Sequence, residues 1–251
     1  MSERKAGRIG IIGAGRIARA IMAGIASGEA GAYEICAVLV RKAGDRPGID
    51  GLVTTDRAQF LATRPDLIVE AAGPGGLAEH GVASLAVADV WSISGMALGD
   101  AAFAARIEVA GRQSGHRLRL LGGAITGLDA ASVAARDPEA RMLIEAVTDA
   151  TGDGDVADFE GSAREAVNTL HGVNVVAAAA IAGVGLDAAR LRFFERKPGR
   201  RRVFNIRIES NVGSYLMSSS PNLSADTGAT HAVASSVIAA LSQAQRVIWA
   251  G

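Results

Sequence analysis

The feature that most constrains this chain is a glycine-rich turn between an apolar segment and a segment with helical spacing. Residues 7–25 read GRIGIIGAGRIARAIMAGI, with Gly13 and Gly15 in the turn and Ala18 at the third small position. In such a GxGxxA pattern, the first glycine forms the tight turn and the second lets the backbone approach a pyrophosphate, while the third small residue lets the helix contact the strand. The pattern predicts a dinucleotide site that includes Arg16 and Ile17. A structural turn without a ligand is the alternative.

The first half of the chain alternates short β-branched runs with alanine-rich segments of helical spacing. This alternation is typical of a parallel sheet that is covered by helices. We expect strands at residues 8–14, 33–40, 51–55, 66–72, 89–94 and 116–122. The sequence therefore predicts an α/β fold with a Rossmann-type parallel sheet.

The rhythm changes near Gly123, where we place a domain boundary. A helix capped by Thr126 is expected first, followed by the run RMLIEAVT. The acidic, glycine-containing segment DATGDGDVADFEG that comes next is typical of a loop. A long helix of small residues is expected at about 173–184.

Three later segments predict a second sheet, which is antiparallel. Pro198 and Gly199, a hairpin signal, join the runs RLRFFERK and RRVFNIRIES, and VGSYLMSSS supplies a third strand. The apolar run HAVASSVIAALSQAQRVI predicts a closing helix that packs on the first domain. We therefore predict a dinucleotide-binding domain at 1–123, completed by a helix at about 231–251, and an α+β substrate domain at 124–230.

The composition limits the class of partner. The chain of 251 residues has 26 lysines and arginines against 26 aspartates and glutamates, so no net charge directs it to nucleic acid or to an anionic membrane surface. Its single cysteine, Cys36, excludes a disulfide framework and a thiolate metal site. The N-terminal residues lack the apolar core of a signal peptide, and the longest apolar stretch is too short to span a bilayer. We expect a cytoplasmic protein with a small-molecule substrate and no metal.

The end of the second predicted strand bears on the choice of cofactor. An acid at this position binds the 2′-hydroxyl of NAD, whereas a cation accepts the 2′-phosphate of NADP. The strand ends in Arg41 and Lys42, which favours NADP(H). Asp45 is close enough in the sequence to bind a ribose, so NAD(H) is the alternative, and a pair of solvated surface cations is another.

Three glycine-rich segments follow central strands, where open parallel sheets bind the reactive part of a ligand. They are EAAGPGG at 70–76, SISGMAL at 92–98 and LGGAITG at 121–127. None supplies a nucleophile with a base, or metal-ligand spacing, so they predict hydride transfer in which the cofactor carries the chemistry. Ordinary βα turns are the alternative. The cofactor contacts predicted from them are Ala72, Gly73, Ser94 and Gly95, and the substrate contacts are Gly123, Ala124 and Thr126.

Five segments, in this order along the chain, together resemble the L-aspartate dehydrogenase family: GIIGAGRIARAI, VEAAGPGGLAEHGV, SGMALGD, GGAITGLDAASVAA and FEGSAREAVNTLHGVNVVAAAAIAGVGLDAARLRF. The resemblance implies a Rossmann domain and an α+β substrate domain that also forms a homodimer. It further implies that L-aspartate is interconverted with iminosuccinate, or with oxaloacetate and ammonia, using NAD or NADP.

Three departures from the family pattern fall at the catalytic site that the resemblance implies. The family's catalytic histidine corresponds, in the ungapped register, to Phe204, which can neither donate nor accept a proton. A Phe-Pro-Lys-Asn-x-Asn-Val run corresponds to TLHGVNV, so His171 and Gly172 replace the lysine and the first asparagine, whereas Asn174 is retained. An Asn-Pro-Lys-Thr-Ser run before the last helix is reduced to DTGAT.

Two histidines are candidates for a substitute acid–base group. His171 and His231 both stand at helix entrances and would titrate near neutral pH, although a capping or surface histidine is the alternative for each. Asn174 would hold a substrate carboxylate or cap its own helix. His80 is expected on the exposed side of its helix and is not a candidate.

The leading hypothesis is an NADP(H)-preferring oxidoreductase that acts on an amino or imino acid, at a C=N carbon that bears a carboxylate. Arg202, Arg207 and Ser94, with the backbone at 122–124, are further candidate donors to that carboxylate. One alternative is an imine reductase or dehydrogenase for a different amino acid, because a preformed imine needs less acid–base help than ammonia addition. The other alternative, which Phe204 keeps open, is a cofactor-binding sensor or scaffold without catalysis.

Overall fold

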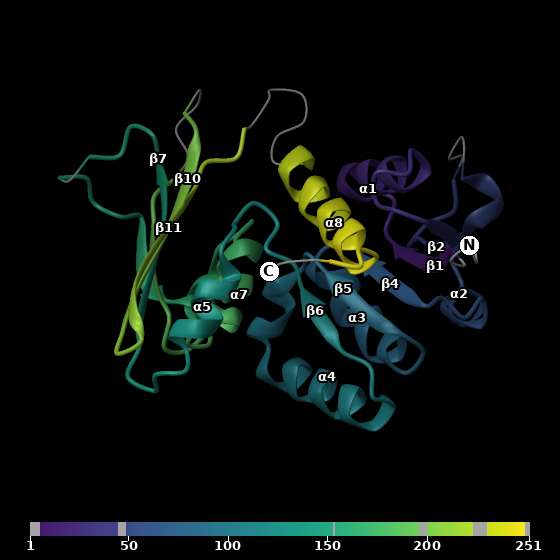
Figure 1. Ribbon diagram of the computed structural model, residues 1–251, viewed down its shortest axis with the longest axis horizontal. Coiled ribbons are helices and arrows are strands. Elements are labelled where there is room, and N and C mark those ends of the chain that lie inside the picture. The colour runs from purple at the N-terminus through teal and green to yellow at the C-terminus, as the bar shows by residue number, and fades with distance from the viewer. Residues whose placement is uncertain (1–5, 45–48, 153, 196–199, 223–229, 249–251) are drawn as a thin grey trace. The chain divides into compact units, whose positions relative to one another are not determined.

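Figure 1 shows the computed structural model of the chain, which describes residues 6–44, 49–152, 154–195, 200–222 and 230–248. The chain divides into two compact units, one formed by Met1–Leu121 with Val233–Ala250 and the other by Gly122–Ala232. Among the residues described, no helix is long and apolar enough to cross a membrane.

The first unit contains a six-stranded parallel sheet in the order β3-β2-β1-β4-β5-β6. Its strands are β1 (Gly7–Ile12), β2 (Tyr33–Leu39), β3 (Val53–Thr54), β4 (Leu67–Glu70), β5 (Asp89–Ser92) and β6 (Leu118–Leu120). All six lie within or overlap their predicted ranges, and each is shorter than predicted. The predicted α/β fold with a Rossmann-type sheet is confirmed. Because β1 and β4 are neighbours, the winding reverses between them, and a crevice is expected at their carboxyl ends.

Helices cover both faces of this sheet (Figure 1). One hydrophobic cluster packs α1 (Arg16–Ala26) and α8 (Thr230–Ala244) against one face. A second cluster packs α2 (Arg57–Ala62), α3 (Pro74–Leu85) and α4 (Ala101–Ser114) against the other. Two short 3-10 helices, η1 (Asp50–Leu52) and η2 (Gly95–Gly99), complete the unit. Burial on both faces explains why these strands read as nearly continuous apolar runs.

The contact between α1 and α8 is close. A Cβ added at Gly24 of α1 would lie 2.4 Å from Cδ1 of Ile238 on α8. Beyond the end of α8, the Gln245 side chain accepts a hydrogen bond of 2.6 Å from the Ala32 N–H and donates one of 2.8 Å to the Ala32 carbonyl. These contacts attach the last helix to the segment that leads into β2.

The second unit contains a five-stranded sheet in the order β11-β10-β7-β9-β8. Its strands are β7 (Arg141–Thr148), β8 (Phe159–Ser162), β9 (Arg190–Phe193), β10 (Arg202–Ser210) and β11 (Gly213–Ser219). The pair of β7 and β9 is parallel and the other pairs are antiparallel, so the sheet is mixed rather than wholly antiparallel. β8 begins inside the segment that was expected to be a loop.

The predicted hairpin between β9 and β10 is wrong. β7 lies between them and pairs with both, so the segment that contains Pro198 and Gly199, two residues outside the described part of the chain, does not join neighbouring strands. The physical reason lies in the alternation along β7, where Met142, Ile144 and Ala146 are buried and their neighbours are not. This period of two is a strand signal, and the pairing places β7 between β10 and β9.

Three helices pack in the second unit: α5 (Leu128–Ala134), α6 (Ala163–Thr169) and α7 (Asn174–Ala182). The predicted cap of α5 by Thr126 is wrong, because the N-cap is Gly127 with a φ of 80° and no side-chain cap. Asn174 is the first residue of α7, whose N-cap is Val173. The alternative prediction, that Asn174 caps this helix, is therefore also wrong. The predicted small-residue helix is α7, and its alanines allow close packing on all sides.

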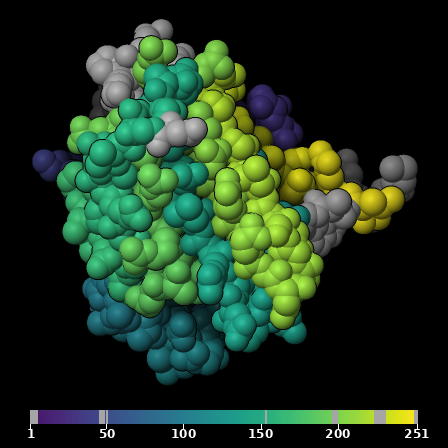
Figure 2. Space-filling model, turned by 90° about the vertical axis from the view of Figure 1, so that its left-hand side faces the viewer, coloured from purple at the N-terminus to yellow at the C-terminus, as the bar shows by residue number. Residues whose placement is uncertain are grey.

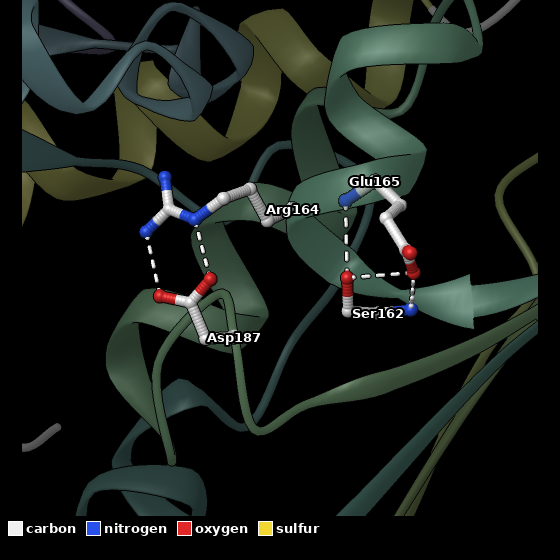
Figure 3. Close-up of polar contacts among 4 residues, drawn as sticks. All are labelled: Ser162, Arg164, Glu165 and Asp187. Atoms are coloured by element: carbon white, nitrogen blue, oxygen red, sulfur yellow. Dashed lines mark hydrogen bonds and ion pairs between the residues drawn. The ribbon is translucent and has the colours of Figure 1, made fainter.

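Side-chain contacts fix the N-terminal end of α6 (Figure 3). Ser162 and Glu165 form a capping box, in which the Ser162 hydroxyl accepts a 3.1 Å hydrogen bond from the Glu165 N–H, and the Glu165 carboxylate accepts one of 2.7 Å from the Ser162 N–H. Arg164 forms a two-pronged ion pair with Asp187, which follows α7, at 2.5 and 2.8 Å. The hydrogen bonds from Ser162 lower the pKa of Glu165.

The face of the sheet opposite α5 carries the exposed side chains, and Figure 2 views the molecule from that side. By alternation from the buried Ile206 and Ile208, Arg207 points to this outer face. Leu216 of β11, which is 69% exposed, lies across from Arg207 on the same outer face.

Replacing Ser162→Ala is expected to lower the free energy of unfolding by about 1 kcal/mol, because the N3 amide of α6 loses its acceptor. Urea unfolding followed by circular dichroism measures the change. Ser162→Thr keeps the hydroxyl and serves as the matched control with nearly wild-type stability. An alanine variant as stable as the threonine variant would contradict the assigned role of the capping box.

Candidate functional site

The glycine turn after β1 is shaped by one close contact and one open space. Gly13 has a φ of 106°, and a Cβ added to it would lie 2.9 Å from the carbonyl oxygen of Ala71. A residue with a side chain would be strained there on both counts. Gly15 is the N-cap of α1, and a Cβ at this position would meet no atom within 4 Å. The first glycine is therefore required by the fold, whereas the second leaves room for something else.

A cavity of about 720 Å³ opens above this turn. Its walls are the turn itself, the end of β2 and the loop that joins β4 to α3. The predicted cofactor residues that line it are Gly13, Gly15, Arg41, Lys42, Ala72 and Gly73. Residues far apart in the sequence thus meet at the crevice where the winding of the sheet reverses.

Four other predicted cofactor residues do not line this cavity. Arg16 is exposed and Ile17 is half-buried, both in the first turn of α1. Ser94 is buried in the turn between β5 and η2, and its hydroxyl has no hydrogen-bond partner within the described structure. Gly95, the first residue of η2, is also buried. Asp45, the candidate for a ribose contact, lies outside the described residues.

The expectation that His80 is exposed is wrong. Its side chain is only 15% exposed and lines the cavity together with Glu79, whose carboxylate lies 3.7 Å from the His80 Nε2. Burial lowers the pKa of His80, against an opposing effect of Glu79. His80 follows the buried Leu77 by three residues, so the helical period was the signal that would have placed it on the inner side.

Glu70 is a functional candidate that sequence reasoning missed. Glu70 is the last residue of β4 and its exposed fraction is 0%. This burial raises its pKa. Its Oε1 accepts hydrogen bonds from the N–H groups of Ala72, at 2.7 Å, and Gly73, at 3.0 Å. Its Oε2 accepts one of 2.5 Å from the Ser92 hydroxyl, which in turn accepts one of 2.9 Å from the Ser94 N–H. A charged residue at the end of an apolar run was the available signal.

In the second unit, Ser219 connects Thr126 with Phe204, because it contacts Thr126 and lies across from Phe204 on the neighbouring strand. The Thr126 hydroxyl is 3.2 Å from that of Ser219, and the Thr126 N–H donates to the same oxygen at 3.3 Å. Ser219 is the register partner of Phe204 across β10 and β11. Phe204 is half-buried and shares the inner face of the sheet with Ile206. Gly123 and Ala124, two further predicted substrate contacts, are half-buried in the preceding turn.

The basic and histidine candidates of the second unit are less closely grouped. Arg202 donates hydrogen bonds to the carbonyl oxygens of Ala146, at 2.8 Å, and Phe194, at 2.6 Å, so its guanidinium has a structural role. Arg207 lies on the outer face, opposite Phe204. His171 is exposed between α6 and α7, Asn174 is half-buried at the start of α7, and His231 is exposed in the first turn of α8. Within the described ranges, no group of three or more His, Cys, Asp or Glu side chains could hold a metal ion.

The two turn glycines are expected to respond differently to alanine. Gly15→Ala places a methyl group in open space, so thermal unfolding is expected to stay near that of the wild type while binding of NADPH or NADH weakens at least tenfold. Gly13→Ala forces a strained φ and a contact with Ala71, so it is expected to lower stability by more than about 1 kcal/mol. Fluorescence titration and thermal denaturation separate the two effects. A Gly15→Ala variant that binds both nucleotides normally would contradict this assignment of the turn.

Comparison with known proteins supports a single family over both units. Residues 13–121 match the family described as "Homoserine dehydrogenase, NAD binding domain", and residues 125–244 match "Aspartate dehydrogenase, C-terminal". The chain is 33% identical over 237 residues to L-aspartate dehydrogenase of Ruegeria pomeroyi, covering 83% of this chain and 81% of that protein. It is also 33% identical over 231 residues to L-aspartate dehydrogenase 2 of Bordetella pertussis, covering 82% and 84%.

The fold agrees with solved structures. Aspartate dehydrogenase from Thermotoga maritima superposes with a TM-score of 0.77 at 21% identity, over 98% of this chain and 99% of that one. A hyperthermophilic archaeal homoserine dehydrogenase in complex with NADPH gives a TM-score of 0.60 at 12% identity, over 94% and 96%. The length and identity of the sequence matches show that the chain belongs to the L-aspartate dehydrogenase family of NAD(P)-dependent dehydrogenases.

Proposed function

We propose that this dehydrogenase prefers NADP(H) and transfers hydride between it and an amino or imino acid: aspartate and iminosuccinate, or a related carboxylate. The observation that carries the proposal is the pair of cations, Arg41 and Lys42, in the wall of the same cavity as the glycine turn. The relatives named above are L-aspartate dehydrogenases, which supports the substrate class.

The bare backbone of the cavity fits a dinucleotide. Gly15, Gly73 and Gly75 all line it, and a side chain at any of them would extend into open space. A pyrophosphate needs backbone N–H groups that no side chain screens, and the first turn of α1 offers such groups at the positive end of its helix. A bound nicotinamide cofactor would supply or accept the hydride.

Arg41 and Lys42 favour the phosphorylated form of the cofactor. They follow the end of β2, where the 2′ substituent of the adenosine ribose is bound in Rossmann folds. A guanidinium and an ammonium can both pair with a 2′-phosphate, and Arg41 can do so through two parallel hydrogen bonds. Asp45, the acid that would instead favour NAD(H), lies outside the described residues.

Replacing both cations, in Arg41→Ala/Lys42→Ala, is expected to raise the KM for NADPH at least tenfold and to change the KM for NADH by less than threefold. A hydrogen bond to a charged group contributes about 1.5–3 kcal/mol, and 1.4 kcal/mol corresponds to a factor of ten. Initial rates with both cofactors measure the effect, with Arg19→Ala, an exposed cation of α1 that does not line the cavity, as the control for loss of a positive charge. Equal losses with the two cofactors would count against a 2′-phosphate site.

Phe204 favours a substrate that arrives as an imine. The inner face around it offers hydroxyl and N–H donors, from Thr126 and Ser219, which can orient a carboxylate. Neither Phe204 nor these hydroxyls is suited to accept a proton at neutral pH, and addition of ammonia to a ketone requires several proton transfers. Reduction of a preformed imine requires one proton at nitrogen, which solvent, His171 or His231 can provide.

Phe204→His is expected to raise the rate of NADPH oxidation with oxaloacetate and ammonia at least tenfold, because a positioned general acid–base contributes roughly 10²–10⁴. Phe204→Leu is the matched control and is expected to show no gain. A stable cyclic imino acid, tested with the wild type, separates imine reduction from imine formation. If the histidine variant gains nothing on oxaloacetate, the correspondence of Phe204 to the family's histidine is wrong.

A further inference from the structure

The loop from Ala71 to Gly76 forms one wall of the cavity and depends on few backbone contacts for its shape. The Ala71 N–H continues the pairing of β4 with β1 by donating to the Ile12 carbonyl at 2.9 Å. Beyond it, Gly73 turns the chain with a φ of 94° before α3 begins at Pro74. Proline has no N–H, so the amides that could anchor this turn are those of Ala72 and Gly73.

Both of these amides donate to one carboxylate oxygen, Oε1 of Glu70. A trans peptide holds its N–H and C=O groups in opposite directions. Because the Ala72 N–H faces Glu70, the Ala71 carbonyl of the same peptide is turned away from it. This is the carbonyl that Gly13 approaches, because a Cβ added at Gly13 would lie only 2.9 Å from its oxygen. Glu70 thus sets the orientation of the peptide that closes on the glycine turn.

The second carboxylate oxygen extends this arrangement to the next strand. Ser92, at the end of β5, donates its hydroxyl to Oε2 and accepts the Ser94 N–H. Glu70, Ser92 and Ser94 are all fully buried. One carboxylate therefore connects the turn after β4 with the turn after β5, the two turns in which four cofactor contacts were predicted.

Hydrogen bonds, rather than a cation, hold the Glu70 side chain in place. Burial raises the pKa of Glu70, and the hydrogen bonds from Ser92, Ala72 and Gly73 act against it and lower the pKa. No cation contributes among the residues described, so the carboxylate is desolvated without an ion pair, which is unfavourable for stability. Three donors compensate for this burial, the N–H groups of Ala72 and Gly73 and the hydroxyl of Ser92, and two of them, Ala72 and Gly73, belong to residues of the cavity wall.

We propose that Glu70 is a positioning residue for the cofactor: its buried carboxylate fixes the peptides at 71–73 and the turn at 92–94, and thereby keeps the cavity in the shape that binds NADP(H). The inference rests on the proposed function of the cavity. Glu70 itself does not line the cavity, so its effect on the cofactor is transmitted through the backbone of Ala71, Ala72 and Gly73.

The test compares Glu70→Ala and Glu70→Gln with the wild type in the full chain. Alanine leaves three buried donors without an acceptor, so the Kd for NADPH, measured by fluorescence titration, and the KM for NADPH are both expected to rise at least tenfold. Glutamine keeps an oxygen for Ala72 and Gly73 and is expected to stay within threefold of the wild type. Ile68→Val, a fully buried change on the same strand, is the control: it lowers thermal stability and leaves Kd and KM unchanged.

The outcomes are distinguishable. A folded Glu70→Ala variant with a wild-type Kd for NADPH would overturn this inference alone, because Kd does not depend on the fraction of active protein. Wild-type protein that binds neither NADPH nor NADH would overturn the proposed function and this inference with it. If Glu70→Ala does not fold, Glu70→Asp, which withdraws the carboxylate from Ala72 and Gly73, takes its place with the same tenfold expectation, and a wild-type Kd in that variant overturns the inference equally.

Discussion

The approach of Gly13 to the carbonyl of Ala71 is the contact on which the rest of the first unit depends. It occurs where β1 and β4 lie side by side, so it joins the two halves of the sheet at the point where the winding reverses. A larger residue at position 13 would push the turn away from the strand ends and close or deform the cavity above them. The fold and the candidate site are therefore not separable here, because the same close packing produces both.

The buried Glu70 continues this constraint from backbone packing to electrostatics. A carboxylate removed from water without a cation opposes folding, and it is tolerated only when donors surround it. The donors at Glu70 are amides of a turn that carries a left-handed glycine, a conformation that local sequence alone would not hold in one orientation. The hydrogen bonds from this turn offset the cost of burying the carboxylate, and the same bonds fix the orientation of the turn beside Gly13.

The parts of this molecule that follow a local period were predictable, and those that depend on distant pairing were not. The six strands of the first sheet read directly as apolar runs, because helices cover both faces. The order of the second sheet was misread, since nothing local in RLRFFERK and RRVFNIRIES indicates that β7 inserts between them. In the site, the positions of Arg41 and Lys42 followed from strand polarity. Glu70 and His80 had local signals, a charge at the end of an apolar run and the helical spacing from Leu77, but those signals do not show which neighbouring elements bury the two side chains.

The inner face of the second sheet favours binding over proton transfer. By register and alternation, its titratable side chains within the described strands are Arg202 and Tyr215. Arg202 is already bonded to two backbone carbonyls, and Tyr215 pairs with Ile208, four residues along β10 from Phe204. By register, Phe204 lies between Ala146 and Ser219, and the hydroxyls of Ser219 and Thr126 can donate or accept hydrogen bonds without a change of charge. A substrate whose nitrogen needs a single proton suits such a surface better than one whose C=N bond must first be made.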